Sequence, residues 1–272
     1  MSLFAISISA LLFSVAISEH ASAQISASDT QRTGNSFVDR FDRLDRDRWY
    51  ISHGWANGAY QHCTFAAGNV KTNTAVELSL IDTPTPERPF TCAEIQTRQF
   101  LGYGTYEVRL RPVIAPGTVT AFFTYTGPPH GKGWPHDEVD FEFLGRATRG
   151  IFLNYFAAGR KHEKYVDLDF DTATSVNDYA FVWLPDSIRW FANGKPIREA
   201  KSESGDPVPS HAQKLYLSIW NGAGPDMEAW LGRFAYPGAP LVAKYEYVAF
   251  TRMGDVCQFP TSIVCQKPEV TR

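Results

Sequence analysis

The segment HDEVDFEFLG, residues 136–145, alternates acidic and apolar side chains. Successive side chains along a β-strand point to opposite faces, so Glu138, Asp140 and Glu142 would share one face. The opposite face would carry Val139, Phe141 and Phe143. The alternation therefore predicts a strand that packing anchors on one side and that presents three carboxyl groups on the other.

Short segments of this kind recur along the chain and are separated by turn residues. Those rich in β-branched and aromatic residues lie at 75–81, 104–113, 118–127, 137–145, 151–159, 179–186, 187–195, 214–222 and 244–252. The step Asn193-Gly194 is a strong signal for a tight hairpin turn. No stretch shows a sustained helical period, and residues 201–210 resemble one long loop. Many short strands with frequent turns predict an all-β fold, an antiparallel β-sandwich or jelly roll.

The row of three acids has the chemistry of glycoside hydrolysis. Carboxyl groups this close raise one another's pKa, so one tends to stay protonated while another is ionised. Glycoside hydrolysis needs such a pair, and the middle acid can hydrogen-bond to the nucleophile and titrate with the others as a coupled set. The outer Cα atoms would lie about 13 Å apart, and side chains leaning inward suit both retaining and inverting enzymes.

Two other interpretations fit the acid row alone. One is a solvated strand face, although such faces usually mix charges with hydroxyl groups. The other is a calcium site, since clustered carboxylates are hard oxygen ligands. Three acids on one straight strand suit Ca²⁺ poorly, because its ligands normally wrap around the ion from a loop.

Composition restricts the class of protein. The chain has 272 residues, 26 Lys and Arg against 29 Asp and Glu, and a formal net charge of −3. Length and a 44% hydrophobic content suit one sizeable domain. The balanced charge and the lack of a Lys/Arg run argue against nucleic acid as a partner. Aromatic residues reach 14%, and those beside Gly or Asn in loops suit stacking on sugars, whereas most phenylalanines are expected in the core.

The N-terminus predicts export. Residues 3–17 are apolar and are followed by the small-x-small sequence ASA, typical of a signal peptide cleaved before Gln24. The run is too short for a membrane anchor, and no later segment is long and apolar enough to span a bilayer. We expect a signal peptide at residues 1–23, a flexible lead-in at 24–36 and a secreted product without a membrane partner.

Four cysteines, an even number, suit an oxidising compartment. Cys257 and Cys265 are close in a Gly/Pro-bearing tail and are expected to close a small loop, which would leave Cys63 and Cys92 to pair. Four cysteines permit three pairings, and the residues alone do not choose between them. No Cys-x-x-Cys spacing suggests a metal site.

Several ordered blocks carry a family resemblance. They are GWANGAYQHCTF, FTCAEIQT, GYGTYEVRL, FFTYTGPPHG, DEVDFEFLG, LNYFAAGRKHEK, YAFVWLPDSIRWFANG and IWNGAGPDMEAWLG. From about Phe37 to Met253 the chain resembles glycoside hydrolase family 16, specifically its lichenase-like branch. The resemblance implies a concanavalin-like β-jelly roll of two stacked antiparallel sheets with a cleft across the concave face. The catalytic domain would occupy residues 37–253, followed by a disulfide-bearing tail at 254–272.

The resemblance also implies roles for individual residues. Glu138 would be the nucleophile, Glu142 the general acid and base, and Asp140 the assisting residue of a retaining double displacement. The matching cleft positions are Trp55, Asn57, Glu94, Phe123, Tyr125, Trp134, Asn154 and Trp220. The two tryptophans at 134 and 220 resemble sugar-stacking residues, with packing at the rim or in the core as the alternative. Asn57 and Glu94 resemble residues that hydrogen-bond sugar hydroxyls.

The same resemblance implies a Cys63–Cys92 disulfide and no cofactor for catalysis. Family members often hold a structural Ca²⁺ on the convex side through backbone oxygens, and Glu246 falls near that place. A monomer is the expected state.

The chain departs from the lichenase pattern around the acid row. Gln96 stands where an arginine usually follows the cleft glutamate, Phe156 replaces a hydroxyl-bearing aromatic residue, and Ser218 replaces an amide. Two extra residues, Pro135 and His136, precede the acidic strand. An intact acid row with altered polar contacts implies a different glycan, because loss of a hydrogen-bonding partner changes selectivity strongly.

This combination resembles family members that depolymerise succinoglycan, a branched, acyl-substituted bacterial exopolysaccharide. The expected activity is a secreted retaining endo-1,3-1,4-β-glycanase acting on that polymer. A lichenase acting on mixed-linkage β-glucan is the alternative. A transglycosylase shares the motif, and a non-catalytic glycan-binding jelly roll is a third interpretation, against which the costly acid row argues.

Overall fold

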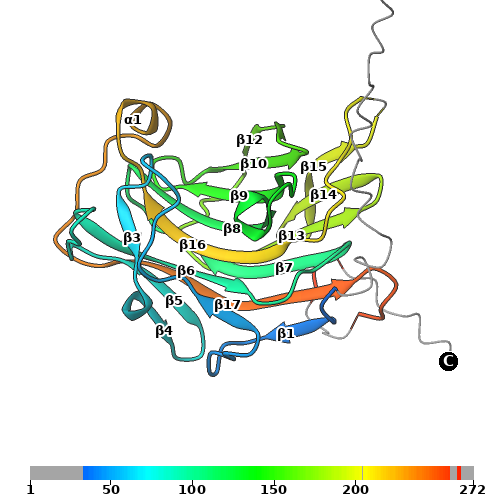
Figure 1. Cartoon of the computed structure of the whole chain (residues 1–272), viewed down its shortest axis with the longest axis horizontal. Helices are drawn as coiled ribbons and strands as arrows, with labels where there is room; N and C mark the ends of the chain where they lie inside the picture. Colours follow the sequence, from blue (N-terminus) through cyan, green and yellow to red (C-terminus); the bar gives the residue numbers. More distant parts are fainter. Residues whose placement is uncertain (1–32, 204, 258–261, 265–272) are drawn as a thin grey trace, which may run out of the picture.

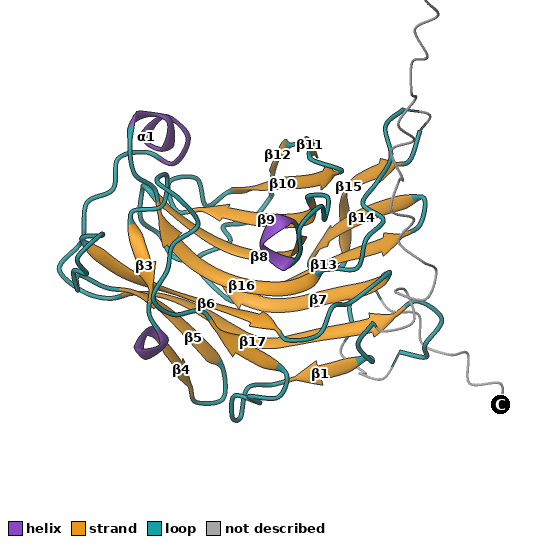
Figure 2. Ribbon diagram, in the orientation of Figure 1, coloured by secondary structure: helices purple, strands orange, loops and turns teal. Residues whose placement is uncertain are grey.

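The computed structural model describes residues 33–203, 205–257 and 262–264. The predicted signal peptide at 1–23, most of the predicted lead-in and Cys265 lie outside the described residues. Within the described part of the chain, no helix is long and apolar enough to cross a membrane. Two sheets stacked face to face make up the molecule (Figures 1 and 2).

The nine-stranded sheet carries the acid row. Its strands are β2 (Trp49–Ile51), β3 (Cys63–Phe65), β6 (Phe90–Thr97), β8 (Thr118–Thr126), β9 (Asp137–Leu144), β10 (Gly150–Ala157), β11 (Arg160–Lys161), β12 (Lys164–Asp167) and β16 (Lys214–Asn221). Their order is β11-β10-β9-β8-β16-β6-β2, with β12 on β10 and β3 on β6. Apart from the parallel pair β3–β6, neighbours in this sheet run antiparallel.

The eight-stranded sheet backs it. Its strands are β1 (Phe37–Asp39), β4 (Val70–Thr72), β5 (Val76–Leu80), β7 (Gly104–Arg111), β13 (Asn177–Leu184), β14 (Ser187–Ala192), β15 (Lys195–Lys201) and β17 (Leu241–Arg252). Their order is β15-β14-β13-β7-β17-β5-β4, and β1 pairs with β17. The two stacked antiparallel sheets confirm the predicted all-β sandwich.

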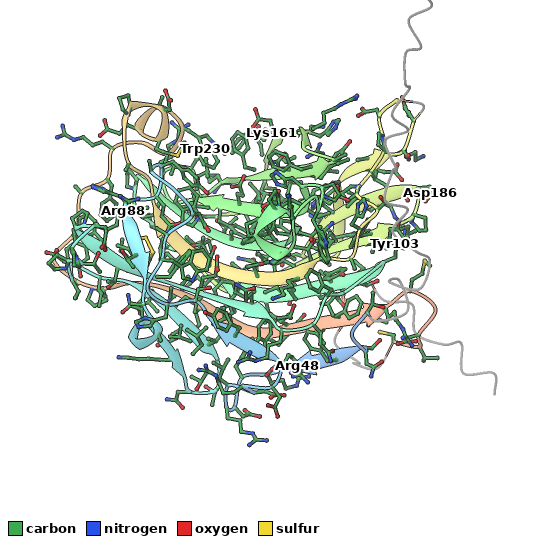
Figure 3. The ribbon with its side chains drawn as sticks, viewed as in Figure 1. Arg48, Arg88, Tyr103, Lys161, Asp186 and Trp230 are labelled. Carbon is green, nitrogen blue, oxygen red and sulfur yellow. A yellow bond between two sulfur atoms is a disulfide. The ribbon has the colours of Figure 1, made fainter. Side chains whose placement is uncertain are left out.

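The core lies between the sheets, where their apolar faces meet (Figure 3). Val139, Phe141 and Phe143 of β9 are at most 2% exposed, as the alternation predicted. The ring of Phe141 lies 5.7 Å from the ring of Tyr179 in the opposite sheet. The indole of Trp190 on β14 donates a hydrogen bond to the carbonyl of Asp140 at 3.2 Å. The back of the acidic strand is therefore fixed by packing and by a polar contact to the other layer.

The predicted hairpin at Asn193-Gly194 is present. Both residues have positive φ, 48° and 79°, and Ala192 pairs with Lys195 across the turn. Positive φ at both central residues matches a type I′ turn, for which asparagine followed by glycine is favoured.

Several elements differ from the sequence expectation, and one helix and two strands among them show why. The helix α1 (Pro225–Leu231) is only seven residues long, too short to show a helical period; Pro225 starts it, and Gly232 ends it with a φ of 79°. Strand β6 was not predicted, because it is buried on both faces and so lacks alternation. Strand β15 was missed because it is a polar edge strand that contains a proline.

The predicted disulfide between Cys63 and Cys92 is confirmed and joins β3 to β6. Cys257 is also disulfide-bonded. Its expected partner, Cys265, lies outside the described residues, so that pairing stays a prediction.

Candidate active site

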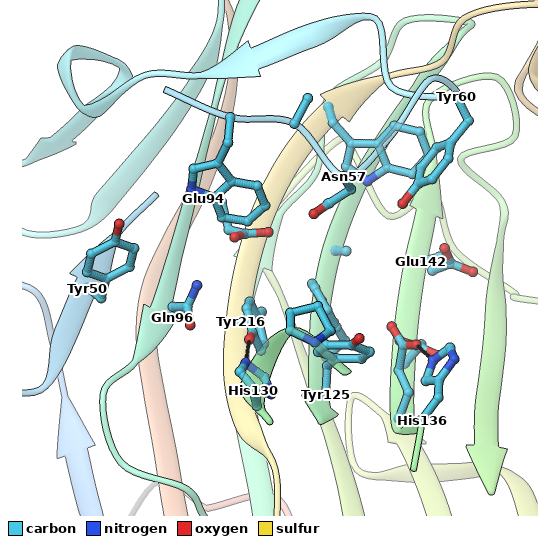
Figure 4. A pocket seen from close by; sticks show the side chains of 18 residues that line it. Tyr50, Asn57, Tyr60, Glu94, Gln96, Tyr125, His130, His136, Glu142 and Tyr216 are labelled. Carbon is cyan, nitrogen blue, oxygen red and sulfur yellow. Dashed lines mark hydrogen bonds and ion pairs between the residues drawn. The ribbon is translucent and has the colours of Figure 1, made fainter. Parts of the chain in front are cut away.

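A cleft of about 670 Å³ crosses the nine-stranded sheet. It is lined by Tyr50, Trp55, Ala56, Asn57, Tyr60, Glu94, Gln96, Ala121, Phe123, Tyr125, Pro129, His130, His136, Glu138, Asp140, Glu142, Tyr216 and Trp220. Figure 4 shows Glu94 and Gln96 on one side of this cleft and His136 and Glu142 on the other. All three acids of the predicted row and six of the eight predicted cleft positions therefore share one cavity.

Trp134 and Asn154 are the two predicted positions that do not line the cavity. The ring of Trp134 packs against Phe100, with ring centroids 5.0 Å apart. Asn154 on β10 is buried and lies opposite Asp140 in the strand register. Its side-chain oxygen and Oδ2 of Asp140 are both buried without a hydrogen-bond partner among the described residues. Asn154 is thus placed beside the acid row on the neighbouring strand, on the same face of the sheet.

The acid row lies between two strands that set its surroundings. The register neighbours are Tyr125 and Phe156 for Glu138, Phe123 and Asn154 for Asp140, and Ala121 and Phe152 for Glu142. None of these neighbours is a cation. The charge of Lys161 on β11 favours lower pKa values for Asp140 and Glu142, but burial and the charge of Glu138 outweigh it.

Burial and mutual repulsion favour the protonated forms of two of the acids. Burial, reinforced by the Glu138 carboxylate, raises the pKa of Glu142 to about 8. Burial, followed by the charges of Glu138 and Glu142, raises the pKa of Asp140 well above its usual range. A protonated Glu142 can donate a proton, and a protonated Asp140 can donate a hydrogen bond to Glu138.

His136 contacts Glu138 directly. Its Nε2 lies 2.5 Å from Oε2 of Glu138. The imidazole stacks on Phe156 at a centroid distance of 4.0 Å and meets the edge of Tyr125 at 5.3 Å. Its backbone carbonyl accepts a hydrogen bond from Gly159 at 2.8 Å. The sequence marked His136 only as an extra residue before the strand, because its contact with Phe156 depends on how β10 pairs with β9.

Glu94 lies on the opposite side of the cleft and is 1% exposed. The hydroxyl of Ser52 donates to its Oε1 at 2.7 Å, but burial dominates and raises the pKa of Glu94 to about 8. Between Glu94 and Glu142 the register places only Ser218 and Ala121. These small side chains leave the floor open between two protonated acids.

Aromatic rings form much of the remaining wall. Tyr60 is 45% exposed and meets Trp220 edge to face at 5.8 Å. Tyr216 stacks on Phe123 at 4.8 Å, and its hydroxyl lies 2.9 Å from Nε2 of His130. Burial, followed by the charge of Lys214, lowers the pKa of His130 to about 4, so its ring is neutral at pH 7 and can accept that bond.

The sequence did not single out several of these lining residues. They are Tyr50, Ala56, Tyr60, Ala121, Pro129, His130 and Tyr216. Their side chains come from five separate segments, and no local pattern marks them as neighbours. Alternation within β8 and β16 could have indicated the faces of Ala121 and Tyr216, but not that the two strands are adjacent.

The side chains around Glu246 do not form a metal site. Glu246 accepts a hydrogen bond from Lys244 at 2.9 Å. Among the described residues, no group of three or more His, Cys, Asp or Glu could hold a metal ion. A calcium ion held by backbone oxygens stays a prediction.

Comparison with known proteins supplies the family. The profile of the family described as Glycosyl hydrolases family 16 matches residues 57–237. The chain belongs to glycoside hydrolase family 16. As a member, it is a glycoside hydrolase with the predicted jelly-roll fold.

Two curated family 16 relatives cover most of the chain. It is 42% identical over 234 residues to the endo-1,3-1,4-beta-glycanase ExoK of Rhizobium meliloti (strain 1021), covering 85% of this chain and 84% of the relative. It is 39% identical over 230 residues to the beta-glucanase of Bacillus subtilis (strain 168), covering 84% and 91%.

Solved structures of other proteins agree with the fold. The Bacillus licheniformis beta-glucanase matches with a TM-score of 0.74 and 38% identity, covering 81% of this chain and all of that one. The laminarinase catalytic domain of Thermotoga maritima MSB8 matches with a TM-score of 0.69 at 18% identity, covering 82% of this chain and all of that one, a likeness of fold alone.

Proposed function

We propose that this glycoside hydrolase is an exported, retaining endo-1,3-1,4-β-glycanase that cleaves a succinoglycan-type bacterial exopolysaccharide. The observation that carries the proposal is the row of Glu138, Asp140 and Glu142 on the floor of an open cleft, with the outer two acids in different environments. The name of one relative, an endo-1,3-1,4-beta-glycanase, supports the linkage specificity.

The different environments of the two glutamates support a role for each in the reaction. Protonated Glu142 donates its proton to the glycosidic oxygen while a carboxylate oxygen of Glu138 bonds to the anomeric carbon and the leaving sugar departs. Asp140, whose pKa burial raises, hydrogen-bonds to Glu138 and disperses its charge. The Glu142 carboxylate then removes a proton from water, which displaces Glu138 and regenerates both groups. Each of the two displacements inverts the anomeric carbon, so the product retains the anomeric configuration of the substrate.

The residues that line the cleft support the proposal that the substrate polymer carries substituents. Phe156 is stacked against His136 and offers no hydroxyl, and the floor between Glu94 and Glu142 carries only small side chains. A site with few fixed polar groups at these places tolerates substituents that a tightly hydrogen-bonded site would reject. The predicted signal peptide and the confirmed disulfide support export.

A panel of purified succinoglycan, lichenan and laminarin, scored by new reducing ends, tests the proposal. We expect cleavage of succinoglycan and weaker cleavage of lichenan, with Glu138→Gln as the inactive control. Activity on laminarin alone would contradict the linkage assignment. Transfer of the cleaved sugar to an added oligosaccharide in preference to water would make the chain a transglycosylase.

A further inference from the structure

Two cations converge at one end of the cleft. In the antiparallel pair β16–β6, Tyr216 lies opposite Gln96, and both residues line the cavity. Lys214 is the first residue of β16, and Arg98 directly follows the last residue of β6. Extended by two residues, the register of this pair places the two cations opposite each other, and the charge of Arg98 acts on Lys214. Directly opposed residues of antiparallel strands have Cβ atoms about 5 Å apart, and like charges there destabilise the sheet.

Lys214 is half-buried and contacts the cleft wall. Its Nζ donates to Oε1 of Gln96 at 3.3 Å and lies 5.5 Å from the ring centroid of Phe100. On the side of β16 away from β6, Lys214 pairs with Tyr125 of β8, which also lines the cavity. Burial, followed by the charge of Arg98, lowers the pKa of Lys214. The ammonium group is therefore held beside a second cation at an energetic cost.

Arg98 is held in place by contacts that leave its charge uncompensated. Its Nε donates to the carbonyl of Arg46 at 2.8 Å, and its guanidinium carbon lies 5.6 Å from the ring centroid of Tyr50. Among the described residues, no carboxylate lies within 4.0 Å of either cation. Other partly buried cations, such as Lys244, do have such a partner.

We propose that Lys214 and Arg98 form a subsite for a carboxylate carried by a sugar residue of the substrate, so that the enzyme acts on an anionic glycan. The inference rests on the proposed function, since it deepens the substrate class of the same cleft. A planar guanidinium and a mobile ammonium together match the two oxygens of a carboxylate. The rings of Tyr50 and Phe100 beside them offer apolar faces to the sugar that carries it.

The position of this subsite fits an anionic chain. Lys214 is two strands from Glu138, through Tyr125, which places their Cα atoms about 10 Å apart. The carboxylate would therefore belong to a residue or branch beside the cleaved unit rather than to that unit itself. The cations would also offset the repulsion between an acidic polymer and the negative charge of the acid row.

The test compares a neutral β-1,3-1,4-glucan with the same glucan after partial oxidation of its 6-hydroxyl groups to carboxylates. The double variant Lys214→Met/Arg98→Gln should lower the ratio of kcat/KM for oxidised over neutral glucan about tenfold. The matched control, Lys71→Met/Arg189→Gln, removes two exposed cations from the eight-stranded sheet and should leave the ratio unchanged. Raising NaCl from about 0.05 to about 0.5 M should lower the ratio for the wild type and the control, and not for the double variant.

An equal ratio in the wild type and the double variant would overturn the inference. If the wild type cleaved neither glucan, the proposed function would fail, and binding would decide the subsite separately. Calorimetry would measure the binding of an oxidised cello-oligosaccharide to two inactive variants. One is Glu138→Gln, and the other carries Lys214→Met and Arg98→Gln in addition. Equal Kd values would overturn the subsite, and weaker binding without the cations would support it.

Discussion

Glu138 and Glu142 carry the same functional group in different surroundings. Burial raises the pKa of Glu142 to about 8. The carboxyl group of Glu138 instead contacts the imidazole of His136, with Nε2 2.5 Å from Oε2. Environments that separate two carboxyl groups in this way are what acid and nucleophile roles require. Each role can be tested by a single substitution.

Replacing Glu142 by alanine should remove the proton donor and leave the nucleophile. We expect kcat/KM on the natural polymer to fall by at least about 10³-fold, and activity on an aryl β-glycoside with a good leaving group to be largely kept in the first step. Parallel assays of the two substrates check this. Equal losses on both would count against an acid role.

Replacing His136 by phenylalanine should keep the stack on Phe156 and lose the contact with Glu138. A hydrogen bond to a charged group is worth about 1.5–3 kcal/mol, so kcat/KM should fall about 10- to 100-fold. Initial-rate assays of the variant, with circular dichroism as the check on folding, measure this loss. Unchanged kcat/KM in a folded variant would show that the contact between His136 and Glu138 plays no part in catalysis.

Strand β9 is held at its start by a second polar contact. The carboxylate of Asp137 accepts hydrogen bonds from the backbone N–H groups of Ala158, Ser210 and His211 and lies 2.8 Å from Nδ1 of His211. Burial alone would raise the pKa of Asp137, but the imidazole and the backbone donors together lower it. The bond to Asp137 raises the pKa of His211 in spite of burial.

These two shifts define a pH window for stability. Because folding raises the pKa of His211, the protonated ring adds to the free energy of unfolding. This contribution is fully present below the ordinary pKa of 6.5 and is lost as pH rises through the folded-state value. Because folding lowers the pKa of Asp137, its carboxylate adds to the free energy of unfolding above the ordinary pKa of 3.8. This contribution is lost as pH falls through the folded-state value. The pair therefore stabilises the folded chain most between these two limits.

The variant His211→Ala should lower the free energy of unfolding by about 1–2 kcal/mol at about pH 5.5, allowing for partial exposure of the ring, and by less at about pH 8.5. Urea unfolding at the two pH values measures the difference. His211→Gln keeps a neutral donor and should lose the pH dependence. A loss of equal size at both pH values would show that charge plays no part.

The confirmed disulfide constrains the molecule as a whole, because it ties β3 to β6 across 29 residues. A loop of this length predicts a loss of about 3–4 kcal/mol on removal of the link. The double variant Cys63→Ala/Cys92→Ala should therefore unfold at lower denaturant concentration, and the two single variants should match it. An unchanged midpoint would mean that the unfolded chain gains no freedom from the change.

Local periodicity explains which parts of the fold were predictable. The two faces of β9 were predicted correctly because side chains alternate along any half-buried strand. The Asn193-Gly194 turn was predicted correctly because few residue pairs adopt positive φ at two successive positions. Strand β6 carries no alternation since both of its faces are covered. The meeting of Lys214 with Gln96, 118 residues apart, follows from the pairing of β16 with β6, which no local pattern encodes.

The assignment of Glu138 as nucleophile is tested most directly by azide rescue of Glu138→Ala on an oligosaccharide β-glycoside with a dinitrophenyl leaving group. With the nucleophile removed, azide should occupy its space, attack from the α face, and give the α-glycosyl azide while restoring activity. Proton NMR of the product identifies the anomer. Recovery of the β-glycosyl azide, or no rescue in a folded variant, would contradict the account.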